Sequence, residues 1–466
     1  MLFNSYEFLF FLLPIVLAGY YLLLPKGWRH GWLALGSYVF YGWWDYRFCG
    51  LLLLTTTIDY IAGGRIAVAA TPTAKKRWLA LSVVADLSIL GFFKYYDLGA
   101  ETANAIAQWL GAASGVVPLL HLVLPVGISF YTFQSMSYSI DIYRGHARPA
   151  RSWIDYACYV SLFPQLVAGP IVRYHELDNQ LRERTHSWAK AGAGITLFVL
   201  GLAKKVLLAD AVAPMADWGF AQNSIGLFGA WSSLVAYTLQ IYFDFSGYSD
   251  MAVGLGLMLG FQFPQNFNSP YKSASITEFW RRWHISLSSW LRDYLYIPLG
   301  GNRKGPVRTY MNLFLTMLLG GLWHGANWTF MLWGAFHGAL LALERMNRKR
   351  GFAWVFPRPF QVILNFMLTM YGWVLFRAPT LEGVARMTKG LMGLNGWGVA
   401  YPLADAGTLN WGILILGMGI VFAAKNTWEI RWRPDWRLAA SLAALFVLCV
   451  AIFLVNTSSP FLYFQF

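Results

Sequence analysis

Residues 8–24 read FLFFLLPIVLAGYYLLL and carry no charged side chain. A helix needs about 17–25 residues to cross the hydrocarbon core of a bilayer, so this run is long enough to span it. The run lacks the basic start and the small-residue cleavage site of a secretory signal peptide, and more apolar sequence follows it. We therefore expect it to remain as the first membrane-embedded helix.

The composition of the whole chain agrees with a membrane setting. Of its 466 residues, 57% are hydrophobic and only 12% are charged, whereas about a quarter of the residues of a soluble domain are charged. This excludes an ordinary soluble domain, and the high apolar content excludes intrinsic disorder. We assign the net charge of +14 to basic loops beside anionic lipid headgroups, and we expect no nucleic-acid partner.

Apolar runs of spanning length recur along the chain. Because an all-helical bundle satisfies every backbone group inside lipid, we predict an all-α, polytopic integral membrane protein with 10–13 membrane-embedded helices. We expect one membrane domain over residues 1–466 and no separate soluble domain. The expected spans are 8–24, 31–45, 50–68, 78–95, 122–142, 153–169, 192–213, 225–243, 309–323, 327–343, 360–377, 410–424 and 437–455.

The basic residues between the first spans predict the orientation. Alternate loops carry nine lysines and arginines, and the loops between them carry two. Because basic loops stay in the cytoplasm, the N-terminus should lie outside it. The nine are Lys26, Arg29, Arg65, Lys75, Lys76, Arg77, Arg144, Arg148 and Arg151, and the two are Arg47 and Lys94.

The regular spans fail between Asp244 and Gly325, where short apolar pieces alternate with polar and glycine-rich turns. Irregular backbone at membrane depth is tolerated where protein or a water-filled cavity surrounds it, so we place the functional motifs at about 240–345. Asp244 and Asp250 separate the runs 225–243 and 251–261. They either face a cavity or partner or cap a helix at the interface, and the sequence leaves both interpretations open.

Residues 275–294 show a different pattern. Ser275 and Glu278 have the spacing of a capping box, which predicts a helix start. Apolar residues then recur at steps of 4, 4, 3 and 4, with basic residues off that stripe, so we predict one amphipathic helix near the headgroup plane. The stripe is Phe279, Trp283, Leu287, Trp290 and Tyr294, and the basic residues are Arg281, Arg282 and Arg292.

Three histidines are candidates for proton transfer. Residues 320–327 read GGLWHGAN, between two apolar runs; the glycines allow close backbone approach, and Trp323 adds a bulky ring beside His324. Histidine can take and return a proton near neutral pH, so His324 ranks first. His284 lies about 60° beyond the stripe, where it either points into the protein or anchors an interfacial helix. His337, about 140° from His324 on a common helix, ranks below both.

Other chemistries lack their signatures. The histidines show no His-x-x-x-His or His-x-x-Cys pair and no acid at ligand spacing, so we expect no metal site. No Gly-x-Ser-x-Gly elbow or phosphate-cradling loop appears either. Cys49, Cys158 and Cys449 lie far apart in apolar stretches, so we interpret them as packing residues.

Several motifs in order along nearly the whole chain resemble the membrane-bound O-acyltransferase (MBOAT) family, in particular its bacterial alginate O-acetyltransferase branch. The family's Trp-His-Gly histidine matches His324, and the histidine of its Trp-His-x-Ser-Leu motif matches His284. The matching motifs lie at 1–5, 8–14, 124–131, 163–170, 242–250 and 461–466.

The resemblance implies many helices around a central funnel or tunnel, in a bacterial inner membrane. It implies acetyl transfer from a cytoplasmic thioester donor, acetyl-CoA, with no tightly bound cofactor. A periplasmic or membrane-anchored acetyltransferase partner in an exopolysaccharide synthesis and secretion complex would then acetylate a polymer such as alginate or cellulose.

Acyl transfer to a hydroxyl needs a base and a donor to the developing oxyanion. His324 fits the base, and His284, Asn327 or Tyr248 could orient or stabilise, with Asp244 and Trp323 in support. Arg281 and Arg282 could attract the phosphates of coenzyme A or lipid headgroups.

Two other classes could use the same polar residues. One is a transporter or channel, although paired broken helices in corresponding halves, common in transporters, are not evident here. The other is a structural subunit of a polysaccharide secretion complex. Loss of acyl transfer with unchanged complex assembly in His324→Ala would separate an enzyme from a scaffold.

Overall fold

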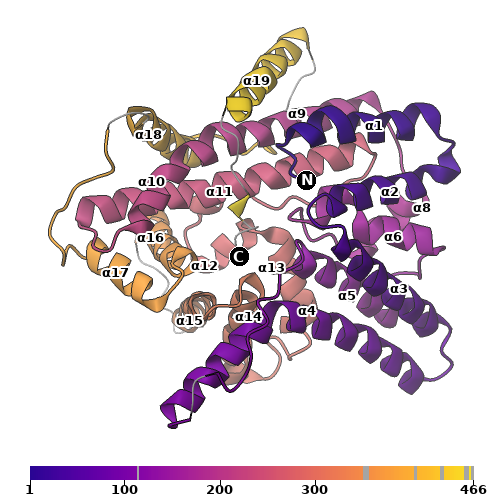
Figure 1. Ribbon diagram of the computed structural model, residues 1–466, viewed down its shortest axis with the longest axis horizontal. Coiled ribbons are helices and arrows are strands. Elements are labelled where there is room, and N and C mark those ends of the chain that lie inside the picture. The colour runs from indigo at the N-terminus through magenta and orange to yellow at the C-terminus, as the bar shows by residue number, and fades with distance from the viewer. Residues whose placement is uncertain (113–114, 350–355, 404–406, 431–434, 456–460, 463–466) are drawn as a thin grey trace. The chain divides into compact units, whose positions relative to one another are not determined.

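The computed structural model (Figure 1) describes the chain apart from residues 113–114, 350–355, 404–406, 431–434, 456–460 and 463–466. It contains two compact units. Unit 1 comprises residues 1–194 and 252–264, and unit 2 comprises residues 195–251 and 265–466. The single membrane domain stays a prediction. Of the closing motif at 461–466, only Phe461 and Leu462 lie within the described residues.

All regular elements of the described residues are helices. In unit 1, α3, α4 and α5 pack side by side (Figure 1). The helices that begin in unit 1 are α1 (Leu13–Ala18), α2 (Arg29–Gly42), α3 (Arg47–Val68), α4 (Pro72–Trp109), α5 (Ile128–Arg144), α6 (Trp153–Ser161), α7 (Phe163–Leu166), α8 (Tyr174–Arg182) and α9 (Trp188–Ala203).

Unit 2 carries the helices of the predicted motif region. They are α10 (Asp210–Ala221), α11 (Leu227–Met258, which ends in unit 1), α12 (Ile276–Arg282), α13 (Ile285–Leu291), α14 (Gly305–His324), α15 (Trp328–Lys349), α16 (Arg358–Arg377), α17 (Leu381–Leu391), α18 (Gly407–Ala423) and α19 (Trp436–Val455).

Four helices of the described residues are long and apolar enough to cross a membrane: α3, α4, α16 and α19. The segment 8–23 and helix α18 are apolar but shorter. The expected spans at 50–68, 360–377 and 437–455 coincide with α3, α16 and α19 to within three residues. The total of 10–13 membrane-embedded helices stays a prediction.

The predicted interruption at Asp244 and Asp250 is wrong, because helix α11 runs unbroken through both residues. Lysines that follow α9 neutralise them: Lys205 Nζ lies 2.7 Å from Asp244 Oδ1, and Lys204 Nζ lies 2.6 Å from Asp250 Oδ2. The two carboxylates are therefore paired inside unit 2, and the interpretation of this stretch as a helix-capping turn is also wrong.

The predicted single amphipathic helix at 275–294 is also wrong beyond its first turns. Ser275 caps α12 by accepting a hydrogen bond from the Glu278 amide at 3.1 Å, as expected. The helix then ends, and His284 adopts a left-handed backbone with φ of +44° before α13 begins. The Asn266 carbonyl accepts the Ile285 amide at 2.9 Å, so a segment distant in sequence holds the break. The whole stripe is buried.

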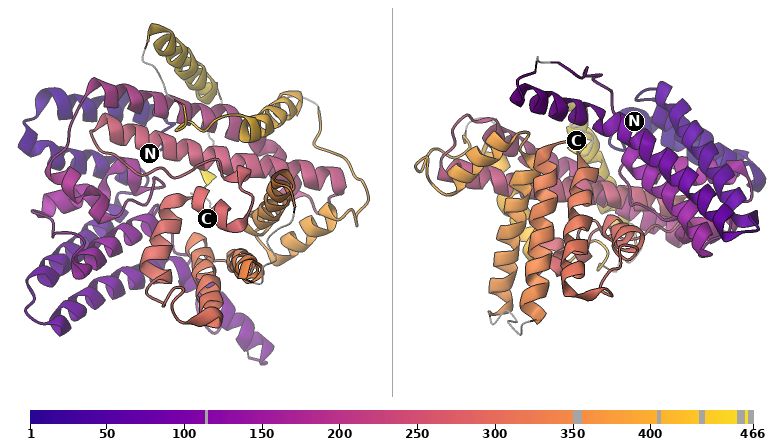
Figure 2. Two further views of the ribbon diagram at one scale, coloured as in Figure 1. Left: turned by 180° about the vertical axis from the view of Figure 1, so that it is seen from behind. Right: turned by 90° about the horizontal axis from the view of Figure 1, so that it is seen from below.

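Helices α14 and α15 pack against each other through glycines (Figure 2, right). A Cβ on Gly321 would lie 2.2 Å from the Phe330 carbonyl, and one on Gly334 would lie 2.4 Å from the Met317 carbonyl. Close helix contact through small residues is a common packing mode in membranes. The expected glycine-dependent approach beside His324 is confirmed.

Candidate functional site

His324 is the last residue of α14 and is only 6% exposed. Aromatic rings surround it: the ring centroids of Trp323, Trp333 and Phe376 lie 4.9, 5.0 and 5.2 Å from that of its imidazole. The chain can turn here because Gly325 has no side chain, as a Cβ would lie 2.2 Å from the Phe330 ring. The imidazole is thus oriented by packing.

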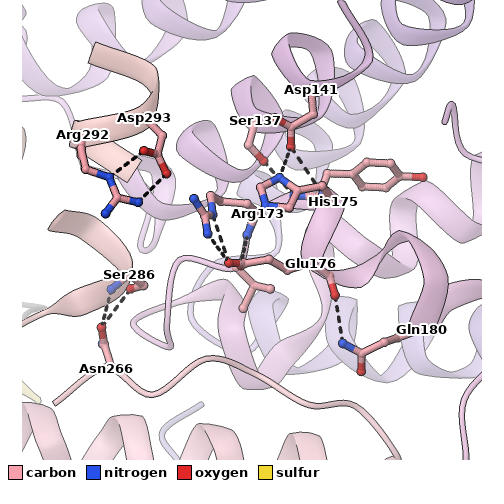
Figure 3. Close-up of polar contacts among 12 residues, drawn as sticks. Ser137, Asp141, Arg173, His175, Glu176, Gln180, Asn266, Ser286, Arg292 and Asp293 are labelled. Atoms are coloured by element: carbon pink, nitrogen blue, oxygen red, sulfur yellow. Dashed lines mark hydrogen bonds and ion pairs between the residues drawn. The ribbon is translucent and has the colours of Figure 1, made fainter. Parts of the chain in front are cut away.

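His284 is fully buried and lies in a hydrogen-bond network. Its Nδ1 is 3.2 Å from Asn266 Oδ1, which also accepts the Ser286 hydroxyl at 2.9 Å (Figure 3 shows the Asn266–Ser286 contact). Asn266 Oδ1 also accepts the Ser286 amide at 3.2 Å, which assigns the amide orientation, and Asn266 Nδ2 donates to Ser249 Oγ at 3.0 Å. Because Asn266 Oδ1 is an acceptor, Nδ1 of a neutral His284 carries the hydrogen and Nε2 carries the lone pair.

Trp323 contacts both histidines within unit 2. The centroid of its indole lies 6.2 Å from the imidazole of His284 and 4.9 Å from that of His324. The structure therefore brings together the two histidines that the sequence ranked highest, with one aromatic ring in contact with each. A shared water-filled cavity between them stays a prediction.

The other candidate residues have varied surroundings. Asp244 pairs with Lys205 and accepts the Leu462 amide at 2.9 Å. Tyr248 is buried three residues after Phe245, whose ring contacts His284. The Tyr248 ring stacks on Phe461 with centroids 4.5 Å apart. Both residues therefore hold the segment at 461–462 against α11.

Asn327 and the two arginines lie at the edges of the site. Asn327 caps α15, since its Oδ1 accepts the Thr329 amide at 3.0 Å and its Nδ2 donates to the Pro379 carbonyl at 2.8 Å. Arg282 pairs with Glu278 at 2.9 Å. Arg281 is exposed. Asn327 and Arg282 therefore have structural partners, and a role of Arg281 toward a ligand or headgroup stays a prediction.

His337, which the sequence ranked third, is fully buried on α15. Its ring contacts those of Trp280 and Trp333, with centroids 5.3 and 5.0 Å away. Trp333 thus contacts both His324 and His337. Within the described part of the chain, no three histidine, cysteine or acidic residues are grouped so that they could hold a metal ion.

Sequence reasoning did not find Asn266, Ser286 or Trp333. Ser286 could have been found from its position two residues after His284. Asn266 is eighteen residues upstream of that histidine, so its position in the sequence does not indicate the contact. Sequence reasoning also did not identify the polar contacts around α8 in unit 1. There His175 Nδ1 lies 2.8 Å from Asp141 Oδ2, and Arg173 pairs with Glu176 (Figure 3). Glu176 accepts the Arg173 amide at 2.9 Å, at the start of α8.

The geometry in unit 2 suits proton transfer in an apolar setting. A neutral imidazole can accept a proton, and a second imidazole with a defined tautomer, in contact with the same indole, can orient a reacting group. Neither imidazole lies against a metal-ligand set in the described residues. A base of this kind is one of the parts that an acyl transfer to a hydroxyl requires.

Comparison with known proteins defines the class to which this fold and site belong. The model of the MBOAT, membrane-bound O-acyltransferase family matches residues 146–378, which include both histidines. The chain belongs to this family and is an O-acyltransferase of the membrane-bound class. The predictions of an all-α membrane protein and of an acyltransferase are confirmed.

Individual relatives are similar over most of the chain. It is 45% identical to "Probable alginate O-acetylase AlgI" of Azotobacter vinelandii over 100% of both chains. It is 50% identical to the protein of the same name in Pseudomonas aeruginosa over 85% of this chain and 76% of that one. It is 35% identical to the "Peptidoglycan O-acetyltransferase" of Helicobacter pylori over 100% of this chain and 98% of that one.

Proposed function

We propose that this protein takes an acetyl group from acetyl-CoA on the cytoplasmic side of a bacterial inner membrane and passes it on for O-acetylation of an exopolysaccharide such as alginate or cellulose. A periplasmic or membrane-anchored acetyltransferase of the polysaccharide complex is the proposed partner. The names of the relatives with 45% and 50% identity support an alginate-type polymer. The relative from Helicobacter pylori shows that a protein with 35% identity is named for a different polymer.

In this proposal His324 is the general base. It takes the proton of an acceptor hydroxyl while the oxygen attacks the thioester carbonyl carbon. A C–O bond forms, the C–S bond breaks, and the proton returns to the departing sulfur, so the products are an acetate ester and free coenzyme A. His284 orients the reacting group by accepting a hydrogen bond through Nε2. The contact of Trp323 with both buried histidines is the observation that carries this assignment.

The test is transfer by purified protein in lipid nanodiscs supplied with [¹⁴C]acetyl-CoA. Release of free thiol together with labelled ester on polymannuronate or on the partner protein supports the proposal. His324→Ala protein of equal yield and equal gel-filtration profile should release neither. Equal thiol release by wild-type and His324→Ala protein would remove His324 from the reaction.

The proposed orientation has its own test. Single cysteines at Ala70, between α3 and α4, and at Ala112, beyond α4, would be placed in a variant whose native cysteines are serine. An impermeant thiol reagent on intact cells should label the cysteine at 112 and leave that at 70 unlabelled until the cells are opened. The opposite pattern would place the N-terminus in the cytoplasm.

A further inference from the structure

Two arginines of unit 1 lie against one tyrosine ring. The Cζ atom of Arg29 is 4.8 Å from the centre of the Tyr20 ring, and that of Arg184 is 5.5 Å from the same point. Two guanidinium groups within 6 Å of one ring repel each other, and this repulsion is strongest where protein excludes water. A bound negative group would reduce this repulsion.

The carboxylate in this neighbourhood is already engaged. Arg184 donates through Nε to the Tyr20 hydroxyl at 2.9 Å, and its Nη1 lies 2.7 Å from His30 Nε2. Because His30 Nε2 accepts this bond, its Nδ1 carries the hydrogen and donates to Asp155 at 2.5 Å. Asp155 also pairs with Arg151 at 3.4 Å. No ion pair joins Asp155 to Arg29 or Arg184 within the described residues.

Arg29 is the more exceptional of the two arginines. Its Nε atom is buried and has no hydrogen-bond partner among the described residues. The contacts of its guanidinium are with the faces of Tyr20 and Tyr21. A buried N–H donor without an acceptor is unfavourable by about 1–3 kcal/mol, and guanidinium groups bind phosphate through paired N–H donors.

The local field is positive at this end of unit 1. His186 Nε2 is 2.9 Å from the Tyr20 hydroxyl, and burial together with Arg184, Arg29 and Lys190 lowers the pKa of His186. Lys190 Nζ donates to the Thr185 carbonyl at 3.0 Å and so stays beside this turn. His186 and two guanidinium groups therefore lie against Tyr20, with Lys190 beside the same turn. The carboxylate of Asp155 is already shared between His30 and Arg151.

The setting is that of a membrane surface. Trp28 and Trp188 lie next to these basic residues in sequence and are 71% and 93% exposed. Exposed tryptophans beside arginine and lysine are typical of the level of the lipid headgroups. The same loop, with Lys26 and Arg29, belongs to the set that we expect on the cytoplasmic side.

We propose that Arg29 and Arg184, over the ring of Tyr20, form a binding site for a phosphate group. The site is in unit 1 and does not depend on the proposed acetyl transfer. The phosphate could belong to an anionic phospholipid or to a soluble ligand such as coenzyme A. The two sources offer the same chemistry to the guanidinium groups, so the experiment must separate them.

The first measurement is lipid retention by native mass spectrometry. Wild-type protein, Arg29→Gln, Arg184→Gln and the double variant would be released from nanodiscs of phosphatidylglycerol or phosphatidylcholine. We expect wild-type protein to retain phosphatidylglycerol and the single variants to retain about tenfold less, because each loses a charge-assisted phosphate contact. Arg47→Gln is the matched control, since Arg47 is an exposed unit 1 arginine already paired with Asp45.

The second measurement competes the bound lipid with coenzyme A and with inorganic phosphate. Displacement of phosphatidylglycerol only by coenzyme A, or binding of coenzyme A without any lipid retention, assigns the site to the soluble ligand. If neither phosphatidylglycerol, coenzyme A nor inorganic phosphate distinguishes wild-type protein from the double variant, the proposal is overturned. Should a glutamine variant fail to fold, Arg29→Lys and Arg184→Lys keep the charge without the paired donors. Unchanged phosphate binding in both lysine variants would show that paired guanidinium donors do not hold the phosphate, and would also overturn the proposal.

Discussion

The surroundings of His284 and His324 differ, although both histidines are buried in unit 2 and both contact Trp323. Polar partners hold His284, whose Nδ1 bonds Asn266 at 3.2 Å. Aromatic packing holds His324, with three ring neighbours within 5.2 Å. One imidazole thus has a fixed tautomer, and the other has a fixed plane.

The two histidines also differ in how the backbone places them. A left-handed backbone costs a residue other than glycine about 1–3 kcal/mol, and His284 adopts it with φ of +44°. Such strain persists where the surroundings impose it, here through bonds from Asn266 to three atoms of residues 284–286. His324 needs no strained backbone, because the end of α14 and Gly325 place it directly.

The largest effect should come from His324, which tests whether the aromatic enclosure holds the base. His324→Ala and His324→Gln should each lower the rate of acetyl transfer by about 10²- to 10⁴-fold, because one proton-transfer group is removed. Membrane levels should be unchanged. The measurement is acetylated product per folded molecule, with His337→Gln on the neighbouring helix as the matched control. Near-wild-type acetylation in both His324 variants would contradict the assignment.

A double-mutant cycle then asks whether the two environments serve one step. If His284 and His324 act together, the double alanine variant should be hardly worse than the more damaging single variant, since residues acting as a unit are not additive. If His284 only anchors the break between α12 and α13, its loss should lower protein level and multiply independently with that of His324. Strict additivity, with His284→Ala retaining most activity per folded molecule, would leave His324 alone in the site.

Asn266 should show a smaller effect that depends on His284. Asn266→Ala removes the acceptor that fixes the tautomer, so we expect about a tenfold to 10²-fold lower rate, as for other groups that orient a catalytic or metal-bound histidine. In a His284→Ala background the same substitution should change the rate little. The rates of the four proteins give the coupling directly, and an equal loss in both backgrounds would show that Asn266 acts only on the fold.

The sequence predicts what depends on neighbours in the chain. The ends of α3, α16 and α19 follow from apolar runs bounded by polar residues, and the start of α12 follows from Ser275 and Glu278. The position of His324 at a helix end follows from the glycines around it, because Gly325 must meet the Phe330 ring closely.

Contacts between distant segments escape such reasoning. Helix α11 continues through Asp244 because Lys205, 39 residues earlier, neutralises that carboxylate. The helix at 275–294 breaks because the main chain and side chain of Asn266 capture the amides of Ile285 and Ser286. Apolar periodicity describes only one helix at a time. It therefore predicts a helix that continues through His284, and it misses the break between α12 and α13.

The smallest effect should come from Asn327, the second asparagine near a candidate histidine. Its amide bonds the Thr329 amide and the Pro379 carbonyl, so it caps α15 and does not take the place that Asn266 has beside His284. Loss of such a cap lowers stability by about 1 kcal/mol. We therefore expect Asn327→Ala to lower the midpoint of thermal unfolding slightly and to leave the transfer rate per folded molecule within about twofold, far less than the change expected for a proton-transfer group. Asn327→Asp keeps an acceptor for the Thr329 amide and should retain more stability than Asn327→Ala. A tenfold or greater loss of rate in Asn327→Ala at unchanged stability would instead place this amide beside the reacting group, and the contrast drawn between the two asparagines would fail.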